Sequence, residues 1–513
     1  MAIKVDRRRE IVEKAINSTA MRGFLLKALK KCPDCGTSHL DAALARIGGH
    51  DDATLCFTGK TYYHMLYSIL KGLLRFAKID DEIFLKEVTG DVAYRRGAIN
   101  LLTGLAKYGL VKPMVAGTAP FLVVWDITRK CNLKCEHCYS NAGVQYAKLP
   151  IDQGGDLSFE QRKEVIDQLA DAGVVILAFS GGEPMMADRF WDLAKYAKER
   201  GFKLAMASNG TLIKDIETAQ RLKEVGVQYI EISLDHVDPK VHDTFRGVEG
   251  AWERAVRGIK NAAAAGIYTV VATTLTKKNY DESLEQLLQL RAEWGADNNL
   301  FFNFIPTGRG RDIIKSDLSP EEREHALDII YTSMSEFGCG FTTAPQYARY
   351  TLTKFREKGQ GPVAISHFAI VPPTYAAEIV ADLIGGCGVG RFYCSIEANG
   401  DMQPCVFMPI TLGNVLKDGF RNIWENHPVL KTLRTRKYLK GHCSVCEFKK
   451  DCGGCRSRAW GYFRDLNAPD PGCIRNKKYW EELRAEITND DEKSTPKCYD
   501  PIYVPLDAVK DKK

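Results

Sequence analysis

The chain of 513 residues has little that would place it in a membrane or on a nucleic acid. No apolar run approaches the roughly 18 residues of a transmembrane helix, and we expect no transmembrane segment. The N-terminus lacks the basic-then-apolar order of a secretory signal peptide, so we expect a cytoplasmic protein. The net charge of +6 is small for this length, which argues against a nucleic-acid partner. Internal repeats and low-complexity tracts are also lacking.

Cysteine, by contrast, is abundant. Of sixteen cysteines, three lie within 32–56, three within 131–138 and eight within 387–473. In a reducing compartment such groups bind metal or carry out redox chemistry more often than they form disulfides. The distribution therefore predicts several separate metal or redox sites along one chain.

The pattern of apolar residues predicts five segments. We expect a helical N-terminal domain over 1–118, an α/β domain over 119–310, a linker and helical segment over 311–386, a cysteine-rich domain over 387–485 and a C-terminal tail over 486–513. In the second segment, β-branched runs alternate with amphipathic stretches, which indicates βα units and a parallel sheet. Expected strands are 121–127, 174–179, 203–207, 229–234, 269–275 and 300–305. Six strands without a clear seventh predict a partial (β/α)6 barrel.

Cys131, Cys135 and Cys138 closely follow the first expected strand. A loop at the carboxyl end of a strand can wrap three thiolates around one iron–sulfur cluster. Three protein ligands leave one iron open to a cofactor or substrate. The alternative is a structural zinc knuckle, which needs a fourth ligand. His137 is adjacent, but its spacing does not suit that role.

The segment 131–138, CNLKCEHC, resembles the CxxxCxΦC signature of the radical S-adenosylmethionine (AdoMet) superfamily, with His137 in the aromatic position. The resemblance implies a [4Fe–4S] cluster held by Cys131, Cys135 and Cys138, with AdoMet on the open iron. It also implies reductive cleavage of AdoMet to methionine and a 5′-deoxyadenosyl radical, which abstracts hydrogen from a C–H bond.

Further positions match the family's cofactor site. Gly181, Gly182, Glu183 and Pro184 resemble its GGEP element, which contacts the AdoMet amino group. Ser208 and Asn209 resemble its polar contact to the carboxylate or ribose, and Ser233 with Asp235 its ribose-binding element. Thr273 falls where the family holds the adenine. Each has an ordinary alternative as a turn or helix cap, but their order at successive strand ends favours one shared pocket.

The eight C-terminal cysteines resemble the SPASM domain found on many radical AdoMet enzymes. That resemblance implies two auxiliary [4Fe–4S] clusters. The first would be held by Cys387, Cys394, Cys405 and Cys455, and the second by Cys443, Cys446, Cys452 and Cys473. Two structural zinc sites, or one cluster with only three ligands, remain open alternatives.

Several C-terminal segments resemble the tails of pyrroloquinoline-quinone maturases and of haem and haem d1 synthesis enzymes: 342–347, 399–405, 412–415 and 451–456. That likeness implies a peptide or tetrapyrrole substrate, oxidation, decarboxylation or bond formation, and an electron donor such as ferredoxin or flavodoxin. A lipid or other small metabolite is an alternative substrate. The rival class is a non-catalytic iron–sulfur carrier or sensor. A cobalamin-binding Asp-x-His-x-x-Gly element is lacking, which disfavours a common type of methyltransferase.

The N-terminal segment carries a possible half of a zinc knuckle, Cys32 and Cys35, which Cys56 with His39 or His50 could complete. The alternative is a cysteine-bearing turn between helices. This segment could also recognise the substrate.

Overall fold

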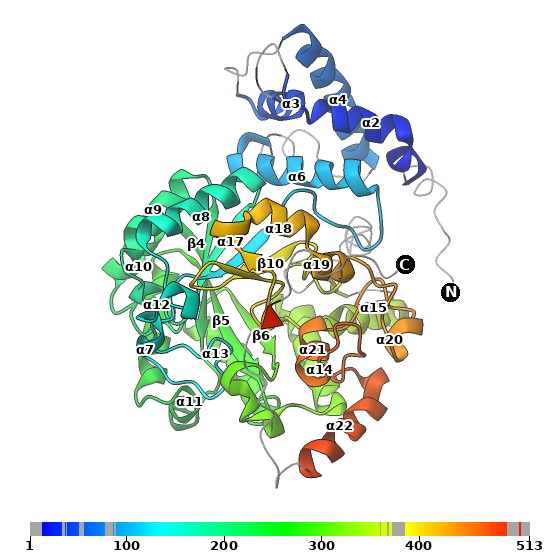
Figure 1. The fold of residues 1–513 in the computed structure, drawn as a ribbon. Helices are drawn as coiled ribbons and strands as arrows, with labels where there is room; N and C mark the ends of the chain where they lie inside the picture. The colour runs from blue at the N-terminus through cyan, green and yellow to red at the C-terminus, as the bar shows by residue number, and fades with distance from the viewer. Residues whose placement is uncertain are drawn as a thin grey trace.

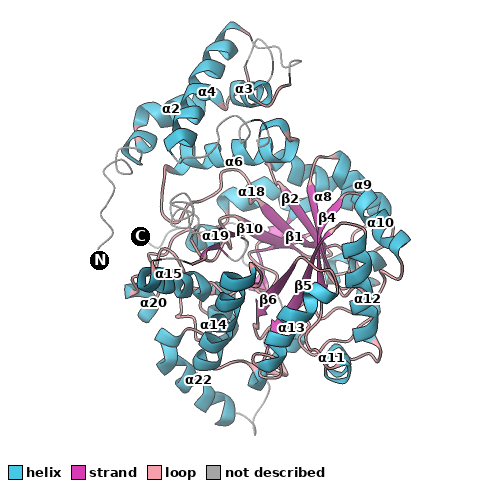
Figure 2. Cartoon of the chain, turned by 180° about the vertical axis from the view of Figure 1, so that it is seen from behind, coloured by secondary structure: helices cyan, strands magenta, loops and turns pink. Residues whose placement is uncertain are grey.

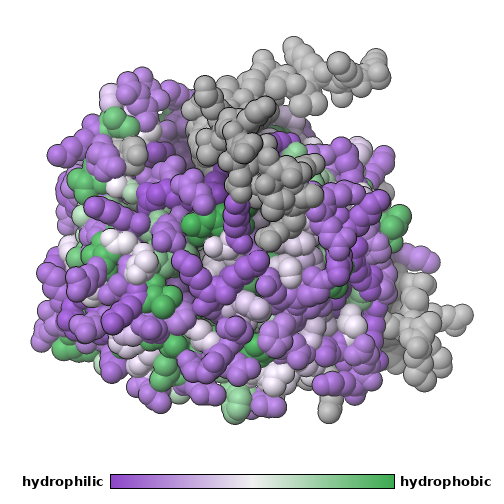
Figure 3. Space-filling model, turned by 90° about the horizontal axis from the view of Figure 1, so that it is seen from below, coloured by the Kyte–Doolittle hydropathy of each residue, from purple (hydrophilic) through white to green (hydrophobic). Residues whose placement is uncertain are grey.

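A computed structural model describes residues 13–32, 36, 38–50, 56–76, 86, 89–359, 361–366, 369–371, 385–489 and 502–503. Cys35, Cys498 and most of the tail expected over 486–513 lie outside these residues. Within the described part, no helix combines the length and apolar character needed to cross a membrane. The face in Figure 3 is mainly hydrophilic, with hydrophobic residues in small separate groups.

A ten-stranded sheet organises the molecule, in the order β13-β11-β10-β1-β2-β3-β4-β5-β6-β7. Its central strands run parallel, as the apolar runs predicted (Figure 2). They are β1 (Leu122–Asp126), β2 (Ile176–Ser180), β3 (Lys203–Ser208), β4 (Val227–Ser233), β5 (Tyr268–Leu275) and β6 (Asn298–Asn303). This α/β architecture confirms the predicted fold class.

The sheet extends beyond the six expected strands at both edges. The short β7 (Phe341–Thr342) pairs parallel to β6, and β10 (Tyr393–Ile396) pairs parallel to β1. Two antiparallel strands, β11 (Asp401–Gln403) and β13 (Gly413–Asn414), follow β10. The sequence predicted six strands and no clear seventh, so these additional strands differ from that expectation. The C-terminal cysteine-rich region supplies β10, β11 and β13, so the two domains share one sheet.

Amphipathic helices cover the barrel between its strands (Figure 1). They are α8 (Phe159–Ala172), α9 (Phe190–Glu199), α10 (Ile216–Glu224), α11 (Pro239–Arg246), α12 (Ala251–Ala264) and α13 (Glu282–Glu293). α8 shows why such segments are helical. Ser158 and Gln161 form a capping box at its start, and Gly173 ends it in the left-handed conformation. Short turns complete the barrel: α7 (Val144–Ala147), η1 (Ile151–Gln153), η2 (Pro184–Met186), η3 (Gly308–Arg311) and η4 (Ile314–Ser316).

The N-terminal domain is helical, as expected, with α2 (Thr19–Ala28), α3 (His39–Ile47), α4 (Phe57–Phe76) and α6 (Val92–Tyr108). In Figure 1 and Figure 2, α2 to α4 form a group at one end of the molecule, with α6 between them and the barrel. Arg96 of α6 donates to the carbonyls of Val174 and Arg200, at 3.1 and 2.9 Å. Those residues precede β2 and β3, so α6 docks at the amino ends of the strands.

The remaining elements lie C-terminal to the barrel. α14 (Pro320–Phe337), α15 (Gln346–Lys358) and the hairpin β8 (Val363–Ser366) and β9 (Ala369–Val371) come first. Later elements are β12 (Ile410–Thr411), α17 (Val415–Asp418), α18 (Phe420–Asn426), α19 (Pro428–Leu433), α20 (His442–Val445), α21 (Arg456–Phe463), η5 (Ile474–Asn476), α22 (Lys477–Asn489) and β14 (Ile502–Tyr503). One buried apolar core runs from the barrel into this region and includes Trp125 and Trp424. That shared core holds the two domains in a defined relation.

Candidate active site

The loop after β1, which carries Cys131, Cys135 and Cys138, lies directly against the turn after β2. The backbone N–H of Gly182 donates to the carbonyl of Thr128, and that of Glu183 to the carbonyl of Lys130, both at 2.8 Å. A Cβ at Gly182 would lie 2.1 Å from the Lys130 carbonyl oxygen. Only glycine permits this close approach. The glycine pair therefore holds the cysteine loop in place.

The three thiols suit an iron–sulfur cluster. Burial raises the pKa of Cys131 to about 12 and also raises the pKa of Cys135. Such thiols remain protonated at neutral pH unless a metal ion supplies positive charge. The Leu133 N–H donates to the Cys131 sulfur at 3.4 Å, and the Arg246 guanidinium lies 3.6 Å from the Cys135 sulfur. These donors favour the thiolate form, so the residues present fit the cluster.

His137 does not serve as a fourth protein ligand in this arrangement. Its ring stacks on Phe245, with centroids 4.3 Å apart and an interplanar angle of 9°. Burial lowers the pKa of His137 well below its usual value, so the imidazole is neutral. The ring therefore packs one side of the cysteine loop.

A cavity opens at the carboxyl ends of the strands, beside the three cysteines. It contains about 1000 Å³ of space not filled by protein atoms, its open mouth included. The predicted residues that line it are Cys131, Cys135, Cys138, Gly181, Gly182, Ser208, Asn209 and Ser233. Residues from four strand ends thus meet at one cavity. The predicted residues Glu183, Pro184, Asp235 and Thr273 lie outside its lining.

Glu183 is fully buried and links the turn after β2 to the end of β3. Its carboxylate accepts from the Ser208 hydroxyl at 2.9 Å and from the Asn209 N–H at 2.9 Å. Burial raises the pKa of Glu183 to about 7. In this structure the side chain therefore positions Ser208 and Asn209, which themselves face the cavity. Its contact to an AdoMet ammonium stays a prediction.

Asp235 is also buried, and it holds Arg246. One carboxylate oxygen accepts from the guanidinium at 2.6 Å, and the other accepts from the Thr274 N–H at 2.9 Å. Thr274, rather than Thr273, faces the cavity, because successive side chains of a strand point to opposite faces. The Thr273 hydroxyl donates to the Leu234 carbonyl instead.

Sequence reasoning missed several residues of this cavity. Arg246 comes from α11, and Phe407 comes from the C-terminal domain. Burial raises the pKa of Glu231, on β4, to about 7. Tyr139 donates to Asp126 at 2.9 Å and lies 3.0 Å from the Ser180 hydroxyl. Glu231 is two residues before Ser233 on one strand, a period-two signal that could have found it. Arg246 had no comparable local signal.

The C-terminal cysteines gather in two groups. Cys387 and Cys405 are among the ionisable neighbours of the buried Cys455 thiol. Cys443 and Cys473 are likewise neighbours of Cys452. The Cys387 N–H also donates to the Cys452 carbonyl at 3.4 Å, so the two groups adjoin, and the two ligand sets stay predictions. Burial raises the pKa of Cys405 to about 11, and here too a thiolate requires positive charge from a metal.

Comparison with known proteins agrees with this geometry. The model of the radical SAM superfamily matches residues 125–291, and that of the SPASM iron-sulfur cluster-binding domain matches residues 387–452. An AdoMet-dependent heme synthase of Methanosarcina barkeri is 34% identical over 364 residues, which cover 70% of this chain and 98% of the relative. The chain belongs to the radical SAM superfamily.

Other relatives bear different names. A pre-heme d1 synthase of Dinoroseobacter shibae is 30% identical, over 71% of this chain and 89% of its own length. A mycofactocin maturase of Mycobacterium tuberculosis is 31% identical, over 70% and 83% respectively. The crystal structure of SuiB from Streptococcus suis shares the fold, with a TM-score of 0.56, 20% identity and coverage of 85% and 93%. The chain is therefore a radical SAM enzyme that uses AdoMet and carries a SPASM iron–sulfur domain.

Two further cysteines of the SPASM domain are placed by other contacts. Cys394 lies in the centre of β10, in register with Val123 of β1, and Arg434 is the charged group that faces its thiol. The preceding Tyr393 interacts with Cys405, and successive strand residues face opposite ways. Cys394 therefore points away from Cys405. Cys446 lies 3.7 Å from the Arg475 guanidinium. Both ligand assignments stay predictions.

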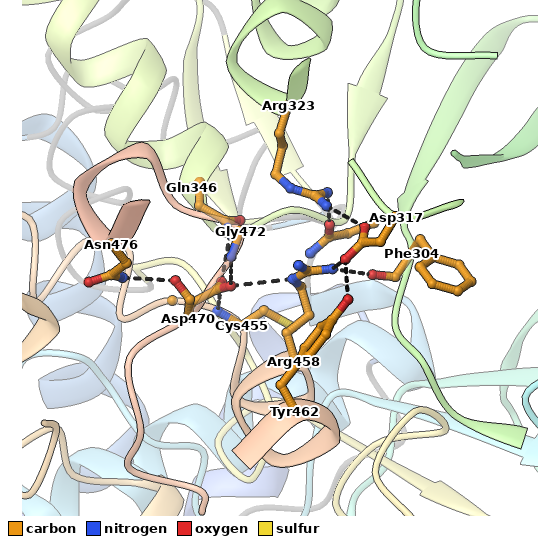
Figure 4. Close-up of polar contacts among 12 residues, drawn as sticks. Phe304, Asp317, Arg323, Gln346, Cys455, Arg458, Tyr462, Asp470, Gly472 and Asn476 are labelled. Carbon is orange, nitrogen blue, oxygen red and sulfur yellow. Dashed lines mark hydrogen bonds and ion pairs between the residues drawn. The ribbon is translucent and has the colours of Figure 1, made fainter. Parts of the chain in front are cut away.

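A buried ionic network joins the SPASM domain to the barrel (Figure 4). Arg458 of α21 pairs with Asp317 at 2.8 Å and with Asp470 at 3.3 Å, and all three side chains are fully buried. It also donates to the carbonyl of Phe304, which lines the cavity. Asp470 in turn accepts from the Cys455 N–H at 2.7 Å. The network thus connects a cysteine of the SPASM domain to the wall of the active-site cavity.

Proposed function

We propose that this radical SAM enzyme abstracts hydrogen from a side chain of a tetrapyrrole and that the substrate is then oxidised with help from the SPASM domain. Relatives named AdoMet-dependent heme synthase, Fe-coproporphyrin III synthase and pre-heme d1 synthase support this substrate class, at 34, 32 and 30% identity. The observation that carries the chemistry is the meeting of three cysteines with the cavity at the strand ends.

The chain's own residues divide the work. When bound, the cluster and AdoMet supply a 5′-deoxyadenosyl radical for hydrogen abstraction. Cys131, Cys135 and Cys138 hold the cluster, while Arg246, fixed by Asp235, keeps a positive charge beside it. Backbone and hydroxyl groups of Gly181, Ser208 and Ser233 orient the cofactor across the strand ends.

The wall of the cavity suits a flat aromatic substrate. The Tyr139 ring meets Phe407 edge to face, with centroids 5.1 Å apart, and Phe302 meets Phe407 at 6.3 Å. Such rings offer apolar faces and edges against which a macrocycle can pack. Phe407 comes from the SPASM domain, so a substrate packed against it would lie between the AdoMet site and that domain. The cysteines of the SPASM domain would hold an auxiliary cluster that would supply an electron acceptor for the substrate radical, and a ferredoxin or flavodoxin would deliver the electron that starts each turnover.

Peptide modification is the second candidate, because the mycofactocin maturase is as similar to this chain as the pre-heme d1 synthase, at 31% against 30% identity. Both candidates use the same hydrogen abstraction. They differ in the molecule that enters the cavity, and the same experiment separates them.

The test measures 5′-deoxyadenosine from anaerobically reconstituted protein given AdoMet and dithionite. Three reactions run in parallel, with iron-coproporphyrin III, with a pool of synthetic decapeptides, and without substrate. We expect the tetrapyrrole to increase the formation of 5′-deoxyadenosine and to be converted to a product of lower mass. The triple variant Cys131/Cys135/Cys138→Ala should form no 5′-deoxyadenosine. The control Cys339→Ser changes a buried cysteine that is hydrogen-bonded to Ser333, and it should form as much 5′-deoxyadenosine as wild type. Stimulation by peptides alone would replace the tetrapyrrole proposal. No AdoMet binding at full iron content would indicate an iron–sulfur carrier.

A further inference from the structure

Three potential metal ligands meet in the N-terminal domain, at the far end from the active site. Cys32 follows α2, His39 is the first residue of α3, and Cys56 directly precedes α4. Their ligand atoms all lie within 4.8 Å of one another. These residues come from three separate segments, so the fold rather than a local motif assembles the group.

The spacing of the two sulfurs matches a single tetrahedral metal. The Sγ atoms of Cys32 and Cys56 are 3.8 Å apart. Two thiolates each about 2.3 Å from one tetrahedral zinc ion lie about 3.8 Å apart, from the geometry of the coordination sphere. In a [4Fe–4S] cluster each thiolate binds a different iron, so the sulfurs lie farther apart. The geometry therefore favours one ion over a [4Fe–4S] cluster.

The contacts around Cys56 and His39 also suit metal ligands. The Gly59 N–H, in the first turn of α4, donates to the Cys56 sulfur at 3.4 Å. A helix N-terminus stabilises a thiolate through such N–H groups and its dipole. The His39 ring stacks on Tyr62, with centroids 5.0 Å apart and an interplanar angle of 11°, which fixes its orientation. His50, the other histidine considered from sequence, instead contacts the Gly90 carbonyl at 2.8 Å.

The N-terminal domain has a reason to need a metal. Among the described residues its cluster of fully buried apolar side chains has five members: Ala28, Leu40, Ala43, Leu44 and Leu66. The other apolar side chains packed against this cluster are only partly buried. Small cores are often supplemented by a structural metal, whose binding energy becomes folding energy. An ion held by Cys32, His39 and Cys56 would join α2, α3 and α4 at their ends.

We propose that Cys32, His39 and Cys56 supply three of the four ligands of a structural zinc ion that stabilises the N-terminal helical domain, the fourth position being taken by a ligand outside these three. The site is separate from both sets of iron–sulfur cysteines. Since α6 docks this domain at the amino ends of the barrel strands, opposite the cavity, the zinc would support the fold and take no part in the radical chemistry.

The test is metal analysis of the full-length protein purified anaerobically with its clusters. We expect about one zinc per chain beside the iron. Cys32→Ser and Cys56→Ser should each lower the zinc content at least about tenfold while iron stays at the wild-type level. His50→Ala and Cys339→Ser are matched controls that should keep zinc. Zinc retained in both cysteine variants, or absent from wild type at full iron content, would overturn the proposal.

Two further measurements on wild type make the result independent of how the variants fold. X-ray absorption at the zinc edge should give at least two sulfur ligands near about 2.3 Å and one nitrogen near about 2.0 Å. A shell of oxygen and nitrogen only would refute the site. Mass spectrometry after alkylation should find Cys32 and Cys56 as thiols, and a disulfide between them would also refute it.

Discussion

Replacing Asp470 by asparagine exchanges one carboxylate oxygen for an amino group in a fully buried network. This change should destabilise the link between the SPASM domain and the barrel. The Asp470 carboxylate accepts from the Cys455 N–H at 2.7 Å, the Gln346 amide at 2.6 Å, the Gly472 N–H at 3.0 Å and Arg458 at 3.3 Å. An asparagine offers one acceptor oxygen, and its amino group would face donors. Arg458 would keep only Asp317 as its ionic partner.

The magnitude follows from the burial. Breaking a buried ion pair by removing one partner costs about 3–5 kcal/mol. For a cooperative unit of about 150–250 residues this corresponds to a fall in melting temperature of roughly 6–20 °C. Because Asp470 also fixes the backbone of Cys455, the variant should lose iron from the cluster that this cysteine holds.

The assay compares Asp470→Asn with Glu321→Gln, by anaerobic thermal melts and iron content. Glu321 pairs with Lys477 at 2.7 Å, but both side chains are about half exposed. Such a surface pair contributes at most about 1 kcal/mol. If Asp470→Asn melts within about 2 °C of Glu321→Gln and keeps all its iron, the network does not hold the two domains as we argue.

Three other predictions follow from particular residues. Gly182→Ala should lose about four iron atoms per chain, measured by iron assay, because its Cβ would lie 2.1 Å from the Lys130 carbonyl oxygen; a full iron load would contradict this. Burial raises the pKa of Glu231 to about 7. Between its usual value of 4.5 and 7 the folded chain keeps a proton that the unfolded chain has released, so this group makes stability fall as pH rises through that window. Glu231→Gln should therefore be more stable than wild type at pH 8, by about 1–3 kcal/mol in the free energy of unfolding, and its melting temperature should be higher there. At pH 4 the two proteins should melt at the same temperature. Equal melting temperatures at both pH values would refute the raised pKa of Glu231. Cys394→Ala should keep the iron that Cys405→Ala loses, and equal loss in both would make Cys394 a ligand.

Local sequence patterns predicted the barrel well because each βα unit carries its own signal. The strand expected at 269–275 begins one residue earlier in the structure, and the strand expected at 203–207 ends one residue later. β10 was not predicted as part of this sheet, because its partner β1 lies far away in the chain. Pairing across such a distance depends on tertiary packing.

The sequence by itself indicated the chemistry. The three cysteines of 131–138 sit on one short loop, where they can share one cluster, and their pattern resembles the radical AdoMet signature. The tertiary structure decided which side chains face that cluster. Strand alternation brought Thr274 to the cavity in place of Thr273 and turned Cys394 away from Cys405. It also brought Arg246 to Cys135, and Cys32 to His39 and Cys56. The physical reason is that ligand spacing within one loop is a property of the local chain. Contacts between distant segments instead depend on register, on the face of each strand and on the packing of whole helices.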